Sequence, residues 1–186
     1  MEIMMVRKII LTTTLVLSSV SSFAGNPSSV ADVVGRDIDQ AYAGHIGMWT
    51  GSKVLEVLSN RGTIFENTLY SFQNQPTKDR KGLKAYWGAK AANITAYKKQ
   101  QVINFGRSQK AYNPQYTTSF SYTEGGIGQY CIAYGRYGTC AKYKTYPINA
   151  TFRCDTFVQW SYLKGAGFKP SGLLPRNVYN SFPITR

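Results

Sequence analysis

The sequence predicts an α+β fold in which helices pack against an antiparallel sheet. The β-prone stretches GHIGMWTG (residues 44–51) and KVLEVL (residues 53–58) adjoin at a Gly-Ser pair, a pattern typical of a β-hairpin. An amphipathic helical pattern covers residues 154–164 and is followed by two glycines and a proline. A weaker helical spacing covers residues 83–102. We therefore expect two central strands and two helices.

The remaining segments give weaker signals. Residues 25–40 are polar and predict no element, whereas residues 104–128 are rich in Tyr, Ser, Thr and Gly and predict an extended loop with short strands. Residues 130–143 predict a two-limbed excursion that turns at its glycines, and residues 173–182 predict a short closing turn or helix. No repeat or linker divides residues 25–186, which we interpret as one domain.

The first 24 residues have the pattern of a secretory signal peptide. A basic start precedes the apolar run IILTTTLV, and Ser22-Phe23-Ala24 places small residues at the expected cleavage site. A membrane anchor is the alternative, but a bilayer span needs about 20 apolar residues and this run is shorter. We expect a mature protein, residues 25–186, that has no transmembrane segment and is exported to the periplasm or secreted.

The charge of the chain is strongly positive, with 22 Lys and Arg against 9 Asp and Glu, for a net charge of +13. Such a balance favours anionic partners, such as a cell-envelope substrate. The basic residues are scattered, and no known nucleic-acid module is present, so we consider nucleic acid an unlikely partner. The sequence also lacks zinc-site spacings, a P-loop and a dinucleotide motif. We therefore expect no metal and no cofactor.

Two of the three cysteines are candidates for a disulfide, which leaves the third without a partner. Cys131 and Cys140 flank a glycine-containing turn, and in an oxidising compartment they are natural disulfide partners. Two free thiols are the alternative. Cys154 then has no partner, so it is either a buried core residue, half of an intermolecular bridge, or a reactive thiol.

The position of Cys154 at the start of a predicted helix favours the reactive thiol among these alternatives. At a helix N-terminus, backbone N–H groups and the helix dipole stabilise a thiolate, and the same N–H groups can hold an oxyanion. We expect the N–H groups of Cys154 and Asp155 to form this oxyanion site. Apolar and small residues continue the same face of the helix, which would direct the sulfur toward the sheet.

A thiol nucleophile needs a base, and the chain contains one histidine, His45, at the start of the first predicted strand. Glu56 interrupts the apolar run of the adjoining strand, where a carboxylate is costly without a partner. Across a hairpin, Glu56 could accept a hydrogen bond from His45 and fix its tautomer. The alternatives are a structural histidine and a glutamate on a solvent-facing strand.

These residues resemble a known family. GHIGMWTG with Val54-Leu55-Glu56, followed much later by RCDTFV (residues 153–158), is similar to the circularly permuted branch of the NlpC-type papain-like superfamily. That branch includes lecithin:retinol acyltransferase-like proteins and bacterial envelope hydrolases, and its histidine strand precedes its cysteine helix. The tail LPRNVYNSF (residues 174–182) is also similar to endings in this group.

The resemblance implies a permuted papain-like fold, with the nucleophile-bearing helix packed against an antiparallel central sheet. It implies Cys154 as nucleophile, His45 as base and Glu56 as the polar third member of a triad. Many acyltransferase-like relatives carry a second histidine at the third position. Glu56 therefore favours the bacterial hydrolases.

We expect an exported cysteine hydrolase that cleaves an amide or peptide bond, such as one in a peptidoglycan stem peptide, through a thioester. One alternative is a lipid or N-acyl hydrolase, or an acyltransferase, of the same fold. Another is a catalytically silent, basic binding module whose tyrosine-rich region contacts a carbohydrate or protein surface.

Overall fold

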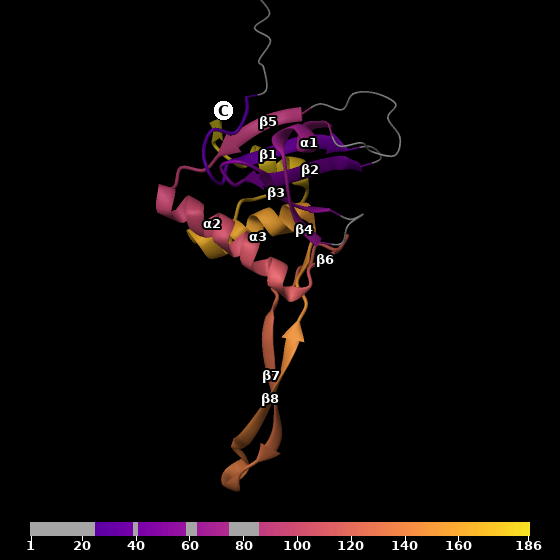
Figure 1. Ribbon diagram of the computed structural model, residues 1–186, viewed down its shortest axis with the longest axis vertical. Helices are drawn as coiled ribbons and strands as arrows, with labels where there is room; N and C mark the ends of the chain where they lie inside the picture. The colour runs from indigo at the N-terminus through magenta and orange to yellow at the C-terminus, as the bar shows by residue number, and fades with distance from the viewer. Residues whose placement is uncertain (1–24, 39–40, 59–62, 75–85) are drawn as a thin grey trace, which may run out of the picture.

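A six-stranded antiparallel sheet forms the centre of the computed structural model, which describes residues 25–38, 41–58, 63–74 and 86–186 (Figure 1). The strand order is β10-β5-β1-β2-β3-β4. These strands are β1 (Val33–Ile38), β2 (Ala41–Trp49), β3 (Val54–Leu58), β4 (Thr63–Asn67), β5 (Tyr86–Ala91) and β10 (Ile184–Thr185). The predicted α+β class with an antiparallel sheet is confirmed. The signal peptide predicted over residues 1–24 lies outside the described residues.

Helices cover the sheet on both sides. They are α1 (Leu69–Asn74), α2 (Ala96–Ser108), α3 (Cys154–Ala166) and α4 (Pro175–Asn180). Helices α2 and α3 lie against each other beneath the sheet in Figure 1, and α1 lies on its opposite side. Helix α3 also contacts β2 and β3, so the helix that begins at Cys154 packs on the sheet. No helix among the described residues is long and apolar enough to cross a membrane.

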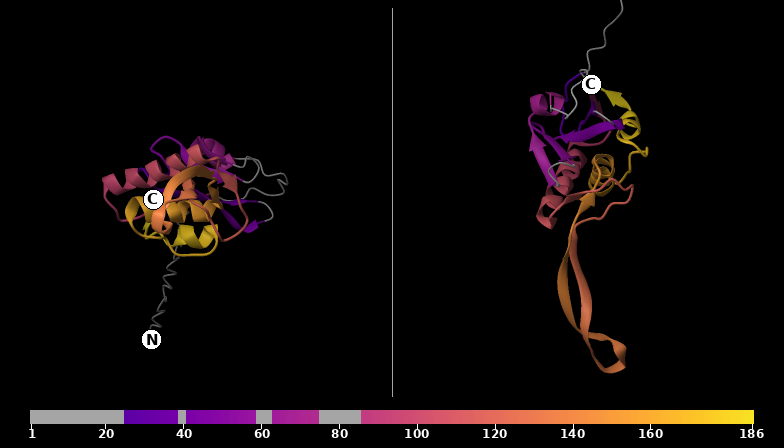
Figure 2. Two further views of the ribbon diagram at one scale, coloured as in Figure 1. Left: turned by 90° about the horizontal axis from the view of Figure 1, so that it is seen from below. Right: turned by 90° about the vertical axis from the view of Figure 1, so that its right-hand side faces the viewer.

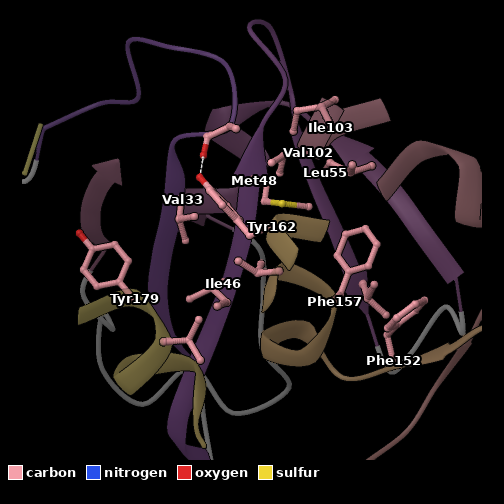
Figure 3. Packing of buried hydrophobic residues seen from close by; sticks show 14 of the residues in the cluster. Val33, Ile46, Met48, Leu55, Val102, Ile103, Phe152, Phe157, Tyr162 and Tyr179 are labelled. Carbon is pink, nitrogen blue, oxygen red and sulfur yellow. Dashed lines mark hydrogen bonds between the residues drawn. The ribbon is translucent and has the colours of Figure 1, made fainter. Parts of the chain in front are cut away.

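The main core lies between the sheet and α3. Ile46 and Met48 of β2 and Leu55 of β3 are fully buried and face Phe157 and Tyr162 of α3 (Figure 3). Each such side chain contributes about 1.5–3 kcal/mol on burial. The hydroxyl of Tyr162 donates a hydrogen bond to the backbone carbonyl of Ala31, so its polar end is also satisfied.

Helices α2 and α3 lie close together at Gly165. A Cβ atom on this glycine would lie 2.3 Å from the backbone nitrogen of Val102, so only a hydrogen fits there. We expected Gly165 to end the helix, but α3 continues to Ala166. The helix ends at Gly167, whose φ of 82° is readily adopted only by glycine, and whose N–H donates to Leu163 O.

The predicted hairpin is confirmed, since β2 and β3 pair antiparallel with Met48 opposite Leu55. We predicted no element over residues 25–40, and this is wrong, because β1 occupies part of this stretch and lies between β5 and β2. Its sequence VVGRDI contains only three apolar residues, yet Val33 and Val34 are both fully buried on opposite faces. Strand pairing on both sides outweighs the weak local signal.

The helix expected over residues 83–102 is confirmed only from Ala96 onward, and residues 83–85 lie outside the described residues. Strand β5 occupies residues 86–91 of this stretch, and α2 begins at Ala96. Thr95 is the N-cap of α2, and its side chain accepts a hydrogen bond from the Lys98 backbone N–H. Gly88 has a φ of 92°, which excludes a continuous right-handed helix. Helix α2 then runs to Ser108, into a segment that we expected to be loop.

A long two-stranded hairpin projects from the body of the molecule (Figures 1 and 2). Its strands are β7 (Gly126–Tyr134) and β8 (Cys140–Ile148), and we call residues 126–148 the arm. The excursion predicted from residues 130–143 is thus confirmed. The short strands β6 (Gln115–Tyr116) and β9 (Thr151–Phe152) pair in parallel beside the base of the arm.

Candidate active site

His45 and Glu56 face each other across the β2–β3 hairpin. The His45 Nε2–H donates to Glu56 Oε2 at 2.6 Å, and the two side chains are buried, with relative exposures of 3% and 0%. The alternative of a glutamate on a solvent-facing strand is therefore wrong. A charged hydrogen bond of this length in a buried setting holds the ring in one orientation.

Gly47 makes room for this pair. A Cβ atom at this position would lie 2.6 Å from Val54 Cγ1 and 3.3 Å from the Cβ of Glu56. The glycine of the motif Gly-His-Ile-Gly therefore permits close packing of β2 on β3, which brings Glu56 to the ring of His45.

Asn67, at the end of β4, holds the other oxygen of Glu56. Its side-chain amide donates to Glu56 Oε1. In the β3–β4 register Glu56 lies opposite Phe65 and Val54 lies opposite Asn67, so Glu56 and Asn67 are diagonal neighbours on one face. We did not predict Asn67, because nothing in its local sequence marks it and the register of β4 is needed to place it.

Arg36 adds a positive charge beside the pair. It lies directly opposite His45 in the β1–β2 register and is buried. Its guanidinium carbon lies 5.2 Å from the ring centre of Phe72, and the His45 ring lies 5.7 Å from the same ring. Burial lowers the pKa of Arg36, and the negative charges of Glu56 and Cys154 offset only part of this decrease. Arginine nevertheless stays protonated in proteins.

Cys154 is the first residue of α3 and is buried, with 2% of its surface exposed. The backbone N–H of Arg153 donates to Thr156 Oγ1 at 2.9 Å, which fixes the start of the helix. The N–H groups of Cys154 and Asp155 belong to the first turn, where helical N–H groups have no intrahelical acceptor.

The Asp155 carboxylate has a structural role at this helix start. The Arg153 Nε donates to Asp155 Oδ1 at 2.6 Å, and the guanidinium also donates to the carbonyl of Leu173 at 2.6 Å. The ring of Phe120 stacks on the same guanidinium, 4.1 Å from its central carbon. These contacts anchor the N-terminal end of α3 to the segments before and after it.

The titration of His45 links it to both partners. Burial by itself lowers the pKa of His45, but the charge of Cys154, a hydrogen bond with Cys154 and the bond to Glu56 outweigh it and raise the pKa to about 9. Since Nε2 is bonded to Glu56, Nδ1 is the ring nitrogen that remains for Cys154. The structure thus brings together all three residues of the predicted triad.

Glu56 stays ionised despite its burial. Burial raises the pKa of Glu56, but the hydrogen bonds from His45 and Asn67 and the charges of His45 and Arg36 oppose this, and the net shift is downward. A carboxylate beside a protonated imidazole favours the charged state of both groups. The site can therefore maintain an imidazolium next to the sulfur of Cys154.

Tyr116 is a third site residue, after Asn67 and Arg36, that the sequence did not reveal. It lies opposite Phe152 in the parallel β6–β9 pair, close to the start of α3. Burial raises the pKa of Tyr116 to about 12, and the nearby charge of Cys154 adds to the shift. The tyrosine-rich region therefore places one of its side chains within electrostatic range of Cys154.

Cys131 and Cys140 form a disulfide with an S–S distance of 2.18 Å. This is the pairing predicted from their spacing. Of the chain's three cysteines, all within the described residues, only Cys154 is free.

Comparison of the chain with protein-family models, with curated proteins and with solved structures finds no significant match in any of the three.

Proposed function

We propose that the protein is an exported cysteine hydrolase that cleaves an amide or peptide bond, with Cys154 as nucleophile and His45 as base. The observation that carries the proposal is the buried His45–Glu56 hydrogen bond of 2.6 Å beside the only free cysteine of the chain. A histidine held by a carboxylate and in contact with a thiol is the arrangement that activates a sulfur nucleophile. The resemblance to the permuted NlpC-type papain-like superfamily, and a fold of that type, belong to the same proposal.

The mechanism is acyl transfer through a thioester. The thiolate of Cys154 attacks the substrate carbonyl carbon, forming a C–S bond, and the N–H groups of Cys154 and Asp155 hold the resulting oxyanion. The His45 imidazolium gives its proton to the leaving amine as the C–N bond breaks. His45 then removes a proton from water, which attacks the thioester and releases the acid and the thiolate. Glu56 keeps Nε2 of the ring occupied throughout.

The proposed substrate is a peptide amide of the cell envelope, with peptidoglycan stem peptides the first choice. Its support is the net charge of +13, which favours anionic material, and the disulfide, which is typical of an oxidising compartment. A lipid ester or an N-acyl bond would use the same three residues. Both substrate classes therefore belong in one assay.

Alkylation of Cys154 tests the site without knowledge of the substrate. We expect iodoacetamide to label the folded protein without reductant or denaturant, because the His45 imidazolium is held beside the sulfur. His45→Gln, which keeps most of the side-chain volume, should slow labelling at least tenfold. A buried core cysteine predicts the reverse, since loosening the packing around a thiol with 2% exposure would speed its labelling.

The substrate assay compares the processed protein with Cys154→Ala on purified peptidoglycan and on phospholipid vesicles. New amino groups in the peptidoglycan digest, absent with the variant, would support the amidase. Free fatty acid would support the lipid branch instead. The catalytically silent binding module would be favoured by two results together: no product from either substrate, and a rate of Cys154 labelling that is the same in the parent and in His45→Gln.

A further inference from the structure

The arm has no core of its own in which to bury its large side chains. Both faces of this two-stranded ribbon lie away from the sheet and helices of the body (Figures 1 and 2). Its exposed large side chains are Ile127, Tyr130, Ile132, Tyr134, Tyr137, Tyr143 and Tyr146. A concentration of exposed apolar and aromatic side chains on a protruding element marks a contact surface.

The charges of the arm have one sign. Arg136, Lys142 and Lys144 are its charged residues, and residues 126–148 contain no Asp or Glu. All three side chains are exposed, and none forms an ion pair with any residue that the structure describes. A cationic element without acids complements an anionic partner.

The side chains are ordered along the arm. Its tip, residues 132–141, carries one charge, and its two tyrosines are the most exposed on the arm: Tyr134 at 73% and Tyr137 at 92%. The two lysines follow on β8, one on each side of Tyr143. The aromatic tip, with lysines farther from the end of the arm, matches a partner that has an apolar interior beneath an anionic outer layer.

The arm is attached firmly to the body. At its base, Thr123 and Thr151 exchange two backbone hydrogen bonds of 2.9 Å, and the Gly125 N–H donates to Gln109 Oε1 at 2.9 Å. Farther out, the Cys131–Cys140 disulfide joins the two strands. Strand β9, which includes Thr151, directly precedes α3 and Cys154, so the arm and the candidate site share one short connection.

We propose that the arm docks the protein on an anionic lipid bilayer, with the tip tyrosines in the interfacial layer and Lys142 and Lys144 at the headgroups. Tyrosine is enriched at this interface because its ring is apolar and its hydroxyl is polar. Lysines near an anionic surface gain from its negative potential. The exposed Ile132, which lies at the tip, favours lipid over a nucleic acid or a glycan, since neither of these offers an apolar layer. This inference goes beyond the proposed function and does not depend on it.

The experiment is flotation of the exported, processed protein with vesicles, after its mass has shown that the first 24 residues are gone. We expect flotation with vesicles of phosphatidylglycerol and phosphatidylethanolamine, and little with phosphatidylcholine. Lys142→Gln with Lys144→Gln should weaken the partition coefficient by about 25-fold, at roughly fivefold per lysine near an anionic surface. Tyr134→Ser with Tyr137→Ser should weaken it about tenfold or more at unchanged charge.

Matched variants on the body separate the arm from the overall charge. Tyr70→Ser with Tyr97→Ser removes two tyrosines that are 75% and 73% exposed, and Lys53→Gln with Lys98→Gln removes two exposed charges. We expect near-parental flotation from both. Thermal melting of each variant checks that the body stays folded.

Three results would overturn the inference. The parent protein could fail to float with the anionic vesicles. The body variants could lose as much partition as the arm variants, which would mean a nonspecific attraction of a basic protein. The arm variants could keep vesicle binding but lose co-sedimentation with purified peptidoglycan, which would make the partner a glycan polymer. Loss of alkylation at Cys154 would bear on the proposed function alone.

Discussion

Glu56 accepts the Nε2 proton of His45 at 2.6 Å from within the sheet, and Asn67 fixes the other carboxylate oxygen. The carboxylate is thus held at both oxygens by neighbours from the two adjacent strands, β2 and β4. The ring of His45 can neither rotate nor lose its Nε2 proton without breaking a buried charged hydrogen bond. This relationship determines how the site should titrate.

The first prediction concerns the protonation of His45. Because the chain has one histidine, a protein purified without a histidine tag gives one set of imidazole resonances in an NMR titration. We expect a midpoint near pH 9, far above the ordinary value of 6.5. Glu56→Gln should lower the midpoint, because the neutral amide no longer stabilises the imidazolium. A midpoint of 6.5 in both proteins would contradict the role assigned to Glu56.

The second prediction follows from the same shift by linkage. The pKa of His45 is raised from 6.5 to about 9 in the folded state, so its contribution to the free energy of unfolding is complete below pH 6.5 and is lost as the pH rises through 9. Urea unfolding of the parent should therefore show a steeper loss of stability between pH 6.5 and 9 than His45→Gln. Parallel curves for the two proteins over this interval would rule out the linkage.

The sequence predicted the hairpin of β2 and β3, the start of α3 and the disulfide because each depends on local chemistry. Glycines flank the strands, a cysteine and an aspartate open the helix, and the cysteine spacing fits a short turn. The three residues of the proposed triad came from the same local signals. They could be assigned without knowledge of the strand order.

The parts that could not be predicted depend on partners distant in the chain. Strand β1 is defined by pairing with β2 and β5, and its own sequence is unremarkable. Arg36 and Asn67 enter the site only through the registers that place them beside His45 and Glu56. The parallel pairing of β6 with β9 places Tyr116 opposite Phe152, two residues before Cys154. A single sequence contains the residue types but not these registers.

The third prediction concerns Asn67 as a positioning residue. Asn67→Ala removes the donor to Glu56 Oε1, so the carboxylate can turn away from His45. We expect the rate of Cys154 alkylation to fall about threefold, less than the loss of at least tenfold expected of His45→Gln, because the base itself remains. The imidazole midpoint should also fall, a change that a purely structural role would not produce. Asn67→Gln, which keeps the amide, is the control and should retain part of both properties.

The fourth prediction concerns the contact of α2 with α3. In Gly165→Ala the added methyl would lie 2.3 Å from the nitrogen of Val102 and 2.4 Å from its Cα, and both atoms are backbone. The helices must move apart, which loosens the packing around Val102, a fully buried residue. Overpacking of this kind costs about 1–3 kcal/mol, so we expect the Tm to fall by about 5 °C.

The matched control for Gly165→Ala is Gly126→Ala at the base of the arm, where a Cβ atom meets nothing within 4 Å. Its Tm should stay close to that of the parent. Because α3 carries Cys154 at its other end, a shift of the helix axis should also reach the site, and the alkylation rate of Gly165→Ala should fall with its stability. An unchanged Tm would mean that the two helices have more freedom to separate than their contact at Gly165 implies. A lowered Tm with an unchanged alkylation rate would mean instead that the N-terminal end of α3 is held independently, by the contacts of Arg153 with Asp155 and Leu173.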